Sequence, residues 1–470
     1  MPLPPGPREP GIVQLVQFSQ RPLAWLDDCA RKFGDPFTLR MPGLGEFVMA
    51  ASPALVKEIF TGDDDVLHAG KANALLEPFV GKHSVLLLDG ASHLRQRRLL
   101  SPPMRGERMQ AYASLIAEIT RAELARMPVG TPFSLHEHMQ SITLEVILRA
   151  VFGLEEGAHM RSLRTLLLAM LEPPPAIMAF IPVRYLDFPL SPFRTFVKRR
   201  AAVTRALREV IRARRAAQAA GGAPGTDILS LLLGARDEDG AAMTEDELCD
   251  ELVTMLVAGH ETTATALSWA FACLLEHRAL ADRLRDELAG VDDPAALAGV
   301  EYLDLVVKET LRLRPVIPDV VRKTQRPMTF AGFDIPAGVS LAPCIHLAHR
   351  RPESWPEPER FLPERFRGAK LDPYAWFPFG GGIRRCIGQA FAMYEMKLVL
   401  GTILPRVELR LANPGTVSAV RRTITLAPKH GTRVIIDRRV DEGLVRGTPR
   451  ATGSPHARPG TGGAGHPPSR

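Results

Sequence analysis

Cysteine is scarce in this sequence, and its pattern gives no sign of a disulfide framework. The chain of 470 residues has 5 cysteines, an odd number, widely scattered and without any CxxC pair. This pattern excludes a disulfide-stapled fold, a zinc ribbon and a thioredoxin-like centre. A reducing, cytoplasmic compartment is therefore what we expect. The cysteines are Cys29, Cys249, Cys273, Cys344 and Cys386.

Long hydrophobic runs are also missing. No stretch reaches the roughly 18–20 consecutive apolar residues of a spanning helix, and the N-terminus lacks the pattern of a signal peptide. We therefore predict no transmembrane segment. Prolines at positions 2, 4, 5, 7 and 10 predict an extended lead-in over residues 1–20. Residues 441–470, rich in Gly, Pro, Ser and Arg, predict a disordered tail, and no long linker divides the single domain expected over 21–440.

The charge is positive overall, with a formal net charge of +7. Arginines recur along a helical pattern from about Pro192 to Ala219. We interpret this stretch as a solvated helix face, with electrostatic contact to a membrane or a partner as the alternative. A basic composition by itself does not indicate nucleic-acid binding, and we expect no nucleic-acid partner.

Hydrophobic periodicity is mostly helical, so the sequence predicts a mainly α fold with small β-sheets. Thr244 and Glu247 have capping-box spacing and open the longest predicted helix, which ends near Glu276. The other predicted helices cover residues 23–33, 54–60, 91–100, 109–126, 135–152, 192–219, 302–313 and 388–404. The predicted strands are two around a turn at 42–45, followed by 328–330, 340–343, 407–411, 423–426 and 433–436.

Cys386 differs from the other cysteines in its surroundings, FPFGGGIRRCIGQAFA. Glycines precede it, Arg384 and Arg385 adjoin it, and a helical pattern starts just after it. Cations and a helix N-terminus both favour a thiolate, so Cys386 is a candidate nucleophile, redox thiol or metal ligand. The glycines lack the spacing of a phosphate-binding loop, and a Cys–His nucleophile has no local support. Haem iron is a further option, because a cysteine thiolate is one of its axial ligands.

The same residues resemble the haem-binding signature of the cytochrome P450 superfamily, the haem-thiolate monooxygenases. The match reads Phe379-x-x-Gly382-x-Arg384-x-Cys386-x-Gly388. The resemblance implies the P450 fold, with haem b held between a long central helix and the Cys386 loop. It also implies that Cys386 is the iron ligand, that Phe379 packs beside the sulfur and that Arg384 pairs with a haem propionate. Gly382 and Gly388 would let the loop turn under the porphyrin.

A second stretch, AGHETTATALSW, lies inside the longest predicted helix. A buried carboxylate there needs a partner, and a threonine inside a helix often only bonds the carbonyl one turn back. His260 and Glu261 begin a zinc HExxH motif, but residue 264 is alanine rather than histidine, so this interpretation fails.

The stretch is similar to the family's oxygen-activation motif. The resemblance implies that Glu261 is the acid and Thr262 the alcohol of a proton relay, with Thr263 as a supporting residue. The small residues Ala258 and Gly259 would let the helix run close over the haem and bend.

Two further stretches, KETLRL and PERFLPERF, support the same family. Glu309 and Arg312 are three residues apart on one helical face and can pair. The resemblance implies that Arg365 joins them in a structural lock rather than in catalysis. A buried charge network of this kind specifies geometry more than it stabilises.

The resemblance also implies contacts to the haem propionates. His93 and Arg97 stand four residues apart on one helical face, and Arg322 follows the Glu309–Arg312 helix. Each of the three alone would be interpreted as a surface cation. Together with Arg384 they would place three arginines and a histidine against two propionate carboxylates.

Apolar segments indicate what the substrate is like. We expect residues 75–88, 173–183, 255–258 and 316–320 to line the pocket, with Val257, Ala258, Val316 and Ile317 as substrate contacts. Few polar groups stand in these segments. The prediction is therefore a lipophilic substrate such as a fatty acid, a terpenoid or a macrocyclic natural product.

The reaction that the resemblance implies is hydroxylation or epoxidation with O2 and two electrons. Only a short tail follows Ile436, so the electrons of NAD(P)H would reach a monomer through a separate ferredoxin and ferredoxin reductase. Arg95, Arg98 and Arg385 are candidates for a basic docking patch, with a solvated face as the alternative. A peroxide-driven haem-thiolate enzyme and a non-enzymatic haem sensor stay open as alternative functions.

Overall fold

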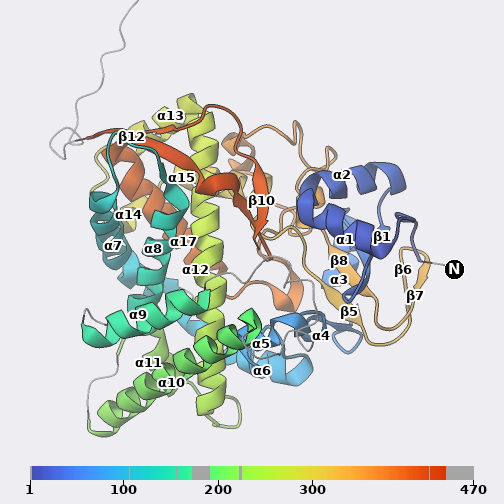
Figure 1. The fold of residues 1–470 in the computed structure, drawn as a ribbon, viewed down its shortest axis with the longest axis horizontal. Helices are drawn as coiled ribbons and strands as arrows, with labels where there is room; N and C mark the ends of the chain where they lie inside the picture. Colours follow the sequence, from blue (N-terminus) through green and yellow to red (C-terminus); the bar gives the residue numbers. More distant parts are fainter. Residues whose placement is uncertain are drawn as a thin grey trace, which may run out of the picture.

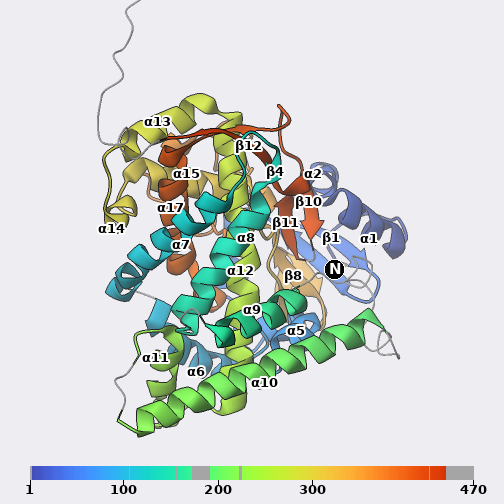
Figure 2. The same cartoon turned by 60° about the vertical axis from the view of Figure 1, so that its left-hand side comes forward.

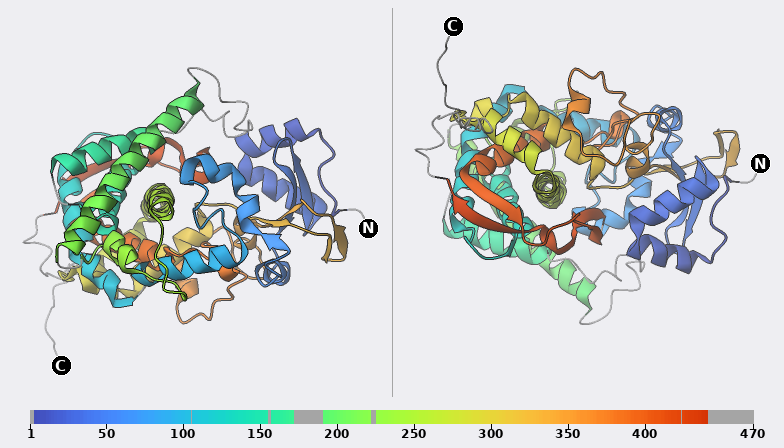
Figure 3. Two further views of the ribbon diagram at one scale, coloured as in Figure 1. Left: turned by 90° about the horizontal axis from the view of Figure 1, so that it is seen from below. Right: turned by 90° about the horizontal axis from the view of Figure 1, so that it is seen from above.

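The structure is a computed structural model that describes residues 3–104, 106–154, 157–171, 191–221, 225–422 and 424–440. One long helix, α12 (Glu245–Glu276), runs through the middle of the molecule (Figure 1). Most helices gather on one side of it, and the N-terminal strands lie on the other. Seen end-on, α12 is surrounded by the other elements (Figure 3). The predicted mainly α fold with small sheets is confirmed.

The helices before α12 are α1 (Gly11–Gln20), α2 (Pro22–Phe33), α3 (Pro53–Phe60), α4 (Ala69–Ala72), α5 (Glu77–Val80), α6 (Gly90–Leu100), α7 (Ala113–Arg126), α8 (Leu135–Val146), α9 (Ala158–Leu171), α10 (Pro192–Ala219) and α11 (Ile228–Gly234). Those after it are α13 (Arg278–Leu288), α14 (Pro294–Leu297), α15 (Glu301–Leu313), α16 (Ile345–Ala348) and α17 (Gln389–Ile403).

The strands form small sheets that the helices separate. One five-stranded sheet has the order β1-β2-β8-β5-β3, in which β2 and β8 run parallel. Three short sheets pair β10 with β11, β6 with β7, and β12 with β4 and β9. The strands are β1 (Phe37–Met41), β2 (Gly45–Ala50), β3 (Leu67–His68), β4 (Phe133–Ser134), β5 (Arg322–Thr324), β6 (Met328–Phe330), β7 (Phe333–Ile335), β8 (Ser340–Pro343), β9 (Val407–Leu411), β10 (Ala419–Arg422), β11 (Thr425–Pro428) and β12 (Arg433–Arg439).

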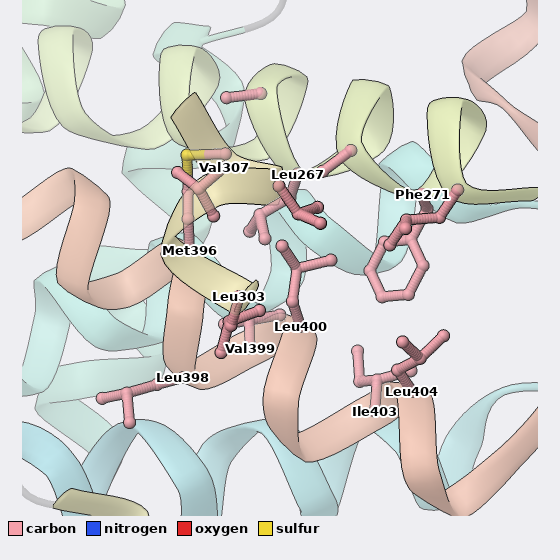
Figure 4. Close-up of a cluster of buried hydrophobic side chains, with 14 of the residues drawn as sticks. Leu267, Phe271, Leu303, Val307, Met396, Leu398, Val399, Leu400, Ile403 and Leu404 are labelled. Atoms are coloured by element: carbon pink, nitrogen blue, oxygen red, sulfur yellow. The ribbon is translucent and has the colours of Figure 1, made fainter. Parts of the chain in front are cut away.

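The capping box predicted for α12 is present. The Thr244 hydroxyl accepts from the Glu247 N–H at 3.2 Å, and the Glu247 carboxylate accepts from the Thr244 N–H at 2.7 Å. Both bonds satisfy N–H groups that the first turn leaves free. The second half of α12 is buried in the largest apolar core, where Leu267 and Phe271 pack with side chains of α15 and α17 (Figure 4). This packing fixes the position of α12.

The basic helix α10 crosses the lower end of α12 (Figure 2). Its arginines are not merely solvated. Arg212 and Arg208 pair with Glu245 and Asp246 in the first turn of α12, at 2.9 Å and 2.6 Å. These pairs are exposed, so each contributes little to stability, but they neutralise part of the charge that the sequence places here.

Some sequence predictions differ from the structure in detail. The lead-in is not extended throughout, because residues 11–20 form α1, which buries Leu15 and Phe18. The helix predicted from residue 109 starts as a 3-10 turn and becomes α7 at Ala113. The helix predicted over 135–152 ends as a π-turn at Ile147–Val151. The strand predicted at 423–426 is shifted: β11 begins at Thr425 and pairs with β10, which ends at Arg422, as a hairpin.

Within the described ranges, every helix is too short or too polar to cross a membrane. The predicted tail at 441–470 and the predicted pocket segment 173–183 lie outside the described residues.

Candidate active site

Cys386 lies in the loop that leads into α17. Its backbone N–H donates to the Phe379 carbonyl at 2.9 Å, and the N–H groups of Gly388 and Gln389 point at its sulfur. Burial raises the pKa of the thiol, while these N–H groups and the charge of Arg97 oppose the rise. The side chain is nevertheless accessible to solvent. A thiol that solvent reaches can exchange its proton for a metal ion.

The two signature glycines differ in what they do. Gly382 has a φ of +63°, and a Cβ there would lie 2.3 Å from the Phe60 carbonyl oxygen, so the turn requires glycine. Gly388 is the N-cap of α17 with a φ of −81°, and a Cβ there would meet no protein atom within 4 Å. The protein itself therefore demands glycine only at 382. The Phe379 ring is partly buried against the main core.

The middle of α12 has one accessible face. Ala258 is exposed, and Val257, Glu261 and Thr262 are half-buried, although the helix is buried on both sides of this stretch. Residues 258 and 262 are one helical turn apart and share a face. This face is the second solvent-accessible part of the candidate site. Gly259 points elsewhere: a Cβ on it would lie 3.4 Å from Ile147 Cδ1 in the π-turn, so it allows helix packing, and α12 continues past it as one helix.

Glu261 is bound to α8 rather than to its neighbour Thr262. Its Oε2 accepts from Gln140 Nε2 at 2.6 Å, and its Oε1 lies 3.3 Å from Nε2 of the buried His136. Burial favours the neutral acid, but the charge of His136 and the hydrogen bond from Gln140 outweigh it, so the pKa of Glu261 lies below its usual value. Glu261 is therefore held as a carboxylate.

The Thr262 hydroxyl donates to the Ala258 carbonyl one turn back, as threonines in helices often do. Its only proton is thereby used, and its oxygen can accept a hydrogen bond on the accessible face. Thr263 is 3% exposed and faces the core instead. The structure thus brings Glu261 and Thr262 to one stretch of α12 and separates Thr263 from them.

A cluster of cations surrounds His93. Burial and the nearby guanidinium groups of Arg384 and Arg97 lower the pKa of His93 to about 4, and its Nδ1 has no hydrogen-bond partner in the described part of the chain. Burial, helped by Arg384, likewise lowers the pKa of Arg322 to about 10. These four residues come from α6, β5 and the Cys386 loop, and the fold brings them together.

Arg384 already has protein partners. It forms an ion pair with Asp89 at the start of α6 and donates to the carbonyls of Leu88 and Val85 at 2.5 Å and 3.2 Å. Asp89 also accepts from the N–H groups of α4, at 2.8 Å from Gly70. Asp89 was missed from the sequence because its partner is far away in the chain.

Glu309, Arg312 and Arg365 come together as predicted. Glu309 and Arg312 are fully buried and joined by two bonds of 2.7 Å and 2.9 Å. Arg312 also donates to the carbonyls of His349 and Pro358, each at 2.8 Å. Arg365 Nε donates to the same Glu309 carboxylate at 3.1 Å. These contacts tie α15 to the segment that precedes the Cys386 loop.

Three of the predicted substrate contacts, Val257, Val316 and Ile317, are apolar and are packed into the protein's cores. The Val316 carbonyl accepts from the Leu426 N–H of β11 at 2.8 Å, which fixes this segment beside the hairpin. Val316 and Ile317 belong to the main core, whereas Val257 packs against the second core, between α12 and α10. These three predicted substrate contacts thus belong to two separate apolar clusters.

The predicted basic docking patch is smaller than expected. Arg95 pairs with Asp237 at 2.6 Å and with Glu247 at 2.9 Å, and Arg98 pairs with Glu238. Two of the three arginines are therefore neutralised, by Asp237 and Glu238 of the loop before α12 and by Glu247 in its first turn. Arg385 stays exposed, with its Nε bonded to the Gln389 side chain at 2.7 Å.

His136 and Gln140 are the functional candidates that the sequence did not show. Their spacing of four residues places them on one face of α8, which is the only local signal. The carboxylate that they bind lies 121 residues beyond Gln140, and no pattern in a single sequence predicts that contact.

Comparison with known proteins settles the class. The family description that matches is "Cytochrome P450", over residues 3–432. This chain therefore belongs to the cytochrome P450 family, whose members are haem-thiolate monooxygenases.

Its relatives include mycobacterial proteins. Cytochrome P450 135B1 of Mycobacterium tuberculosis is 41% identical over 465 residues, which cover 98% of this chain and 97% of the relative. Cytochrome P450 135A1 of the same organism is 36% identical over 442 residues, covering 93% and 96%.

Solved structures show the same fold. The retinoic-acid-bound cyanobacterial CYP120A1 has a TM-score of 0.80 at 24% identity, covering 94% of this chain and 100% of that chain. The haem domain of cytochrome P450DA has a TM-score of 0.78 at 23% identity, covering 94% and 99%.

The family implies a haem cofactor, and the side chains of this site fit one. An accessible thiol at a helix N-terminus suits iron. The unpartnered Nδ1 of His93 is a buried polar atom that requires a partner. Arg97, Arg322 and Arg384 bring three cations together, a donor set that suits carboxylates such as the haem propionates.

Proposed function

We propose that this protein hydroxylates or epoxidises a lipophilic substrate, such as a fatty acid, a terpenoid or a macrocyclic natural product. The electrons come from NAD(P)H through a ferredoxin and a ferredoxin reductase, and the cofactor is haem b. The observation that carries the proposal is the Glu261–Thr262 pair on the accessible face of α12. The apolar side chains of Val257, Val316 and Ile317 support a lipophilic substrate.

We assign the haem contacts to this chain as follows. Cys386 holds the iron, and His93, Arg97 and Arg322 bind the propionates together with Arg384. Bound haem activates dioxygen. Arg384 keeps its bond to Asp89, so it acts on the propionates through its remaining N–H groups and its charge.

The chain itself controls protons and excludes water. Glu261 holds a negative charge next to the accessible face and takes up a proton there. Thr262 accepts a hydrogen bond at Oγ1, because its own proton is donated to Ala258. Thr262 thereby orients the group that delivers the proton, and Thr263 keeps this part of α12 in place from the core side.

The proposal also covers the compartment, the oligomeric state and the docking of the redox partner. The working unit is a cytoplasmic monomer formed by residues 21–440, with no nucleic-acid partner. Arg385 is the exposed cation that we assign to ferredoxin docking, since Arg95 and Arg98 are already paired.

Thr262→Ala is the variant that tests the proposed reaction. With ferredoxin, reductase and NADPH, we expect it to consume NADPH while product falls about a hundredfold or more, in the range attributed to proton transfer, and hydrogen peroxide accumulates. Thr165→Ala is the matched control, because Thr165 is an exposed helical threonine with the same bond to a carbonyl one turn back. Unchanged product formation by Thr262→Ala would contradict the relay.

The alternative functions give different outcomes in the same assay. A peroxide-driven enzyme forms product with peroxide alone, and a haem sensor forms none under either condition. Binding of lipophilic compounds is read independently, as a shift of the Soret band from low spin to high spin. The reduced, carbon monoxide-treated protein should show the thiolate-type band, and Cys386→Ala should lose it.

A further inference from the structure

A buried polar network lies behind Glu261, on the side of α8. Figures 1 and 2 both show α8 next to α12. His136, on the first turn of α8, is 1% exposed and lies between two residues of α12. Its Nδ1 is 3.1 Å from Ser268 Oγ, and its Nε2 is 3.3 Å from Glu261 Oε1. One imidazole ring therefore contacts both a hydroxyl and the relay carboxylate.

The hydrogen count fixes which nitrogen of His136 carries a proton. The Ser268 hydroxyl donates its only proton to the Ala264 carbonyl at 2.8 Å. At its contact with His136, the serine oxygen can therefore only accept, so His136 Nδ1 is the donor. A neutral ring protonated at Nδ1 would direct the lone pair of Nε2 at Glu261.

The contact between His136 and Glu261 then requires one shared proton. A lone pair on Nε2 facing a carboxylate oxygen is repulsive, whereas a protonated ring and the carboxylate attract each other as an ion pair at 3.3 Å. Among the described residues Nε2 has no aligned hydrogen-bond partner, so this attraction rather than a linear hydrogen bond holds the contact. The proton is on Nε2, as an imidazolium–carboxylate pair, or on Oε1, as an imidazole and a carboxylic acid. Gln140 at 2.6 Å and Thr265 at 3.4 Å also donate to Glu261, and these donors favour the carboxylate form.

Few other charges act on this pair among the described residues. The titratable groups that act on Glu261 are His136 on α8 and His260 on α12. Burial lowers the pKa of His260 to about 4, so it is neutral, and its Nδ1 is 2.9 Å from the Thr143 hydroxyl. On the other side of His136, Gly431 brings backbone close: a Cβ there would lie 3.1 Å from His136 Cβ.

We propose that His136 is a positioning residue of the proton relay, which holds a proton for Glu261 and sets the pH range in which Glu261 can take it up. The Nε2–H bond of the imidazolium breaks, and an O–H bond forms at Glu261 Oε1. This leaves a neutral imidazole and a neutral carboxylic acid. Glu261 then gives this proton to water beside Thr262, and a proton from solvent, entering through the exposed quarter of the Glu261 side chain, restores the pair.

The inference rests on the proposed role of Glu261, but its first test does not depend on turnover. pH-difference infrared spectra of the haem-loaded protein report carboxylic acid bands, and the band that is missing from Glu261→Gln belongs to Glu261. We expect His136→Phe to raise the pH at which this band appears by at least about one unit, a tenfold change in proton affinity. The reason is that the cationic donor is lost while the burial remains.

His138→Phe is the matched control for this experiment. His138 is on the same helix and also bonds a carboxylate, Glu123, at 2.7 Å, yet it does not touch Glu261. It should leave the Glu261 titration unchanged. His136→Gln replaces the phenylalanine variant if that variant does not load haem. Glutamine donates a hydrogen bond but cannot carry a positive charge, so the pH at which the Glu261 band appears should again rise. If the Glu261 band titrates as in the unaltered protein in the variant that loads haem, the proposal is overturned.

A second readout separates this inference from the proposed function. His136→Gln should move the pH profile of product formation, with an unchanged KM for the substrate. If Glu261→Gln forms product at the full rate, the relay itself fails, whatever the spectra show. If Glu261→Gln loses product formation but the histidine variants leave both the band and the pH profile in place, only the role of His136 fails.

Discussion

Two buried charged clusters of this protein differ in how completely they close on themselves. In the first, Arg312 donates all its N–H groups to protein acceptors, and Glu309 accepts from Arg312, Arg365 and the Leu362 N–H at 2.8 Å. The second consists of His93, Arg97, Arg322 and Arg384. There the hydrogen bonds that Arg322 donates within the described residues go to the carbonyls of Val321 and Gly381, at 2.9 Å and 3.3 Å. Arg322 has no carboxylate at ion-pair distance in the described part of the chain.

The difference shows how a structural cluster and a binding cluster can be told apart. A buried ion pair whose hydrogen bonds are all made holds the fold together and needs nothing more. Buried cations that lack such partners lower the stability of the ligand-free protein. An anionic ligand that pairs with them stabilises the protein when it binds. The second cluster is therefore where we propose that the haem propionates bind, and the following predictions test this contrast.

The largest effect is expected from Arg312→Ala. It leaves the Glu309 carboxylate buried without its main partner, and breaking such a pair costs about 3–5 kcal/mol. We expect most of the protein to be unfolded or free of haem. Urea unfolding and the ratio of haem to protein absorbance measure this. Wild-type stability in this variant would show that the first cluster is not a lock.

Arg322→Leu should weaken haem binding without destabilising the haem-free protein. The substitution removes a buried cation without an ion-pair partner, so the free energy of unfolding of the haem-free chain should stay the same or rise. Haem affinity should fall at least about tenfold, because a charged hydrogen bond is worth roughly 1.5–3 kcal/mol. Haem transfer to apomyoglobin measures the affinity. A loss of apoprotein stability as large as that of Arg312→Ala would remove the contrast between the clusters.

His93→Gln should change how stability depends on pH. In the unfolded chain a histidine titrates near 6.5, whereas His93 in the fold has a pKa of about 4. The unfolded state therefore binds a proton first, and stability present above pH 6.5 is lost as the pH falls toward 4. Between about pH 6.5 and pH 4 the variant should lose less stability than the wild type. The difference should be on the order of 2–3 kcal/mol at about pH 4. If unfolding curves show that the two proteins lose the same stability between these two pH values, the assignment is wrong.

The smallest effect is expected from Arg212→Ala on α10. Its bond to Glu245 is as short as those of the first cluster, at 2.9 Å, but its side chain is 67% exposed. Exposed pairs contribute at most about 1 kcal/mol and lose strength in salt. Thermal unfolding at low and high salt measures this, and a loss comparable to that of Arg312→Ala would mean that burial is not what separates the clusters.

Local signals in the sequence predicted much of this fold. The bounds of α10 and α12 follow from helical periodicity, and the α12 start follows from the spacing of Thr244 and Glu247. The Cys386 loop and the Glu309–Arg312 pair lie within short motifs and were found for that reason. The α1 helix was missed because prolines dominate the residues before it, although Leu15 and Phe18 are spaced to share a buried face.

Contacts between distant segments could not be predicted. Asp89 meets Arg384 across 295 residues, and His136 meets Glu261 from another helix. These side chains look like ordinary polar residues in the sequence, because their partners come near only after α6, α8 and α12 have packed. The orientation of Thr263 toward the core likewise depends on how α12 is rotated in the fold.

The length of α12 has a consequence for how this protein can vary. Each residue turns the helix by about 100° and advances it by about 1.5 Å. Deleting one residue between Thr244 and Ala258 would therefore rotate Glu261 and Thr262 away from their present positions, or pull the capped end of α12 off α10. Insertions and deletions should be tolerated in the loops but not here, so the number of residues in α12 matters as much as its composition.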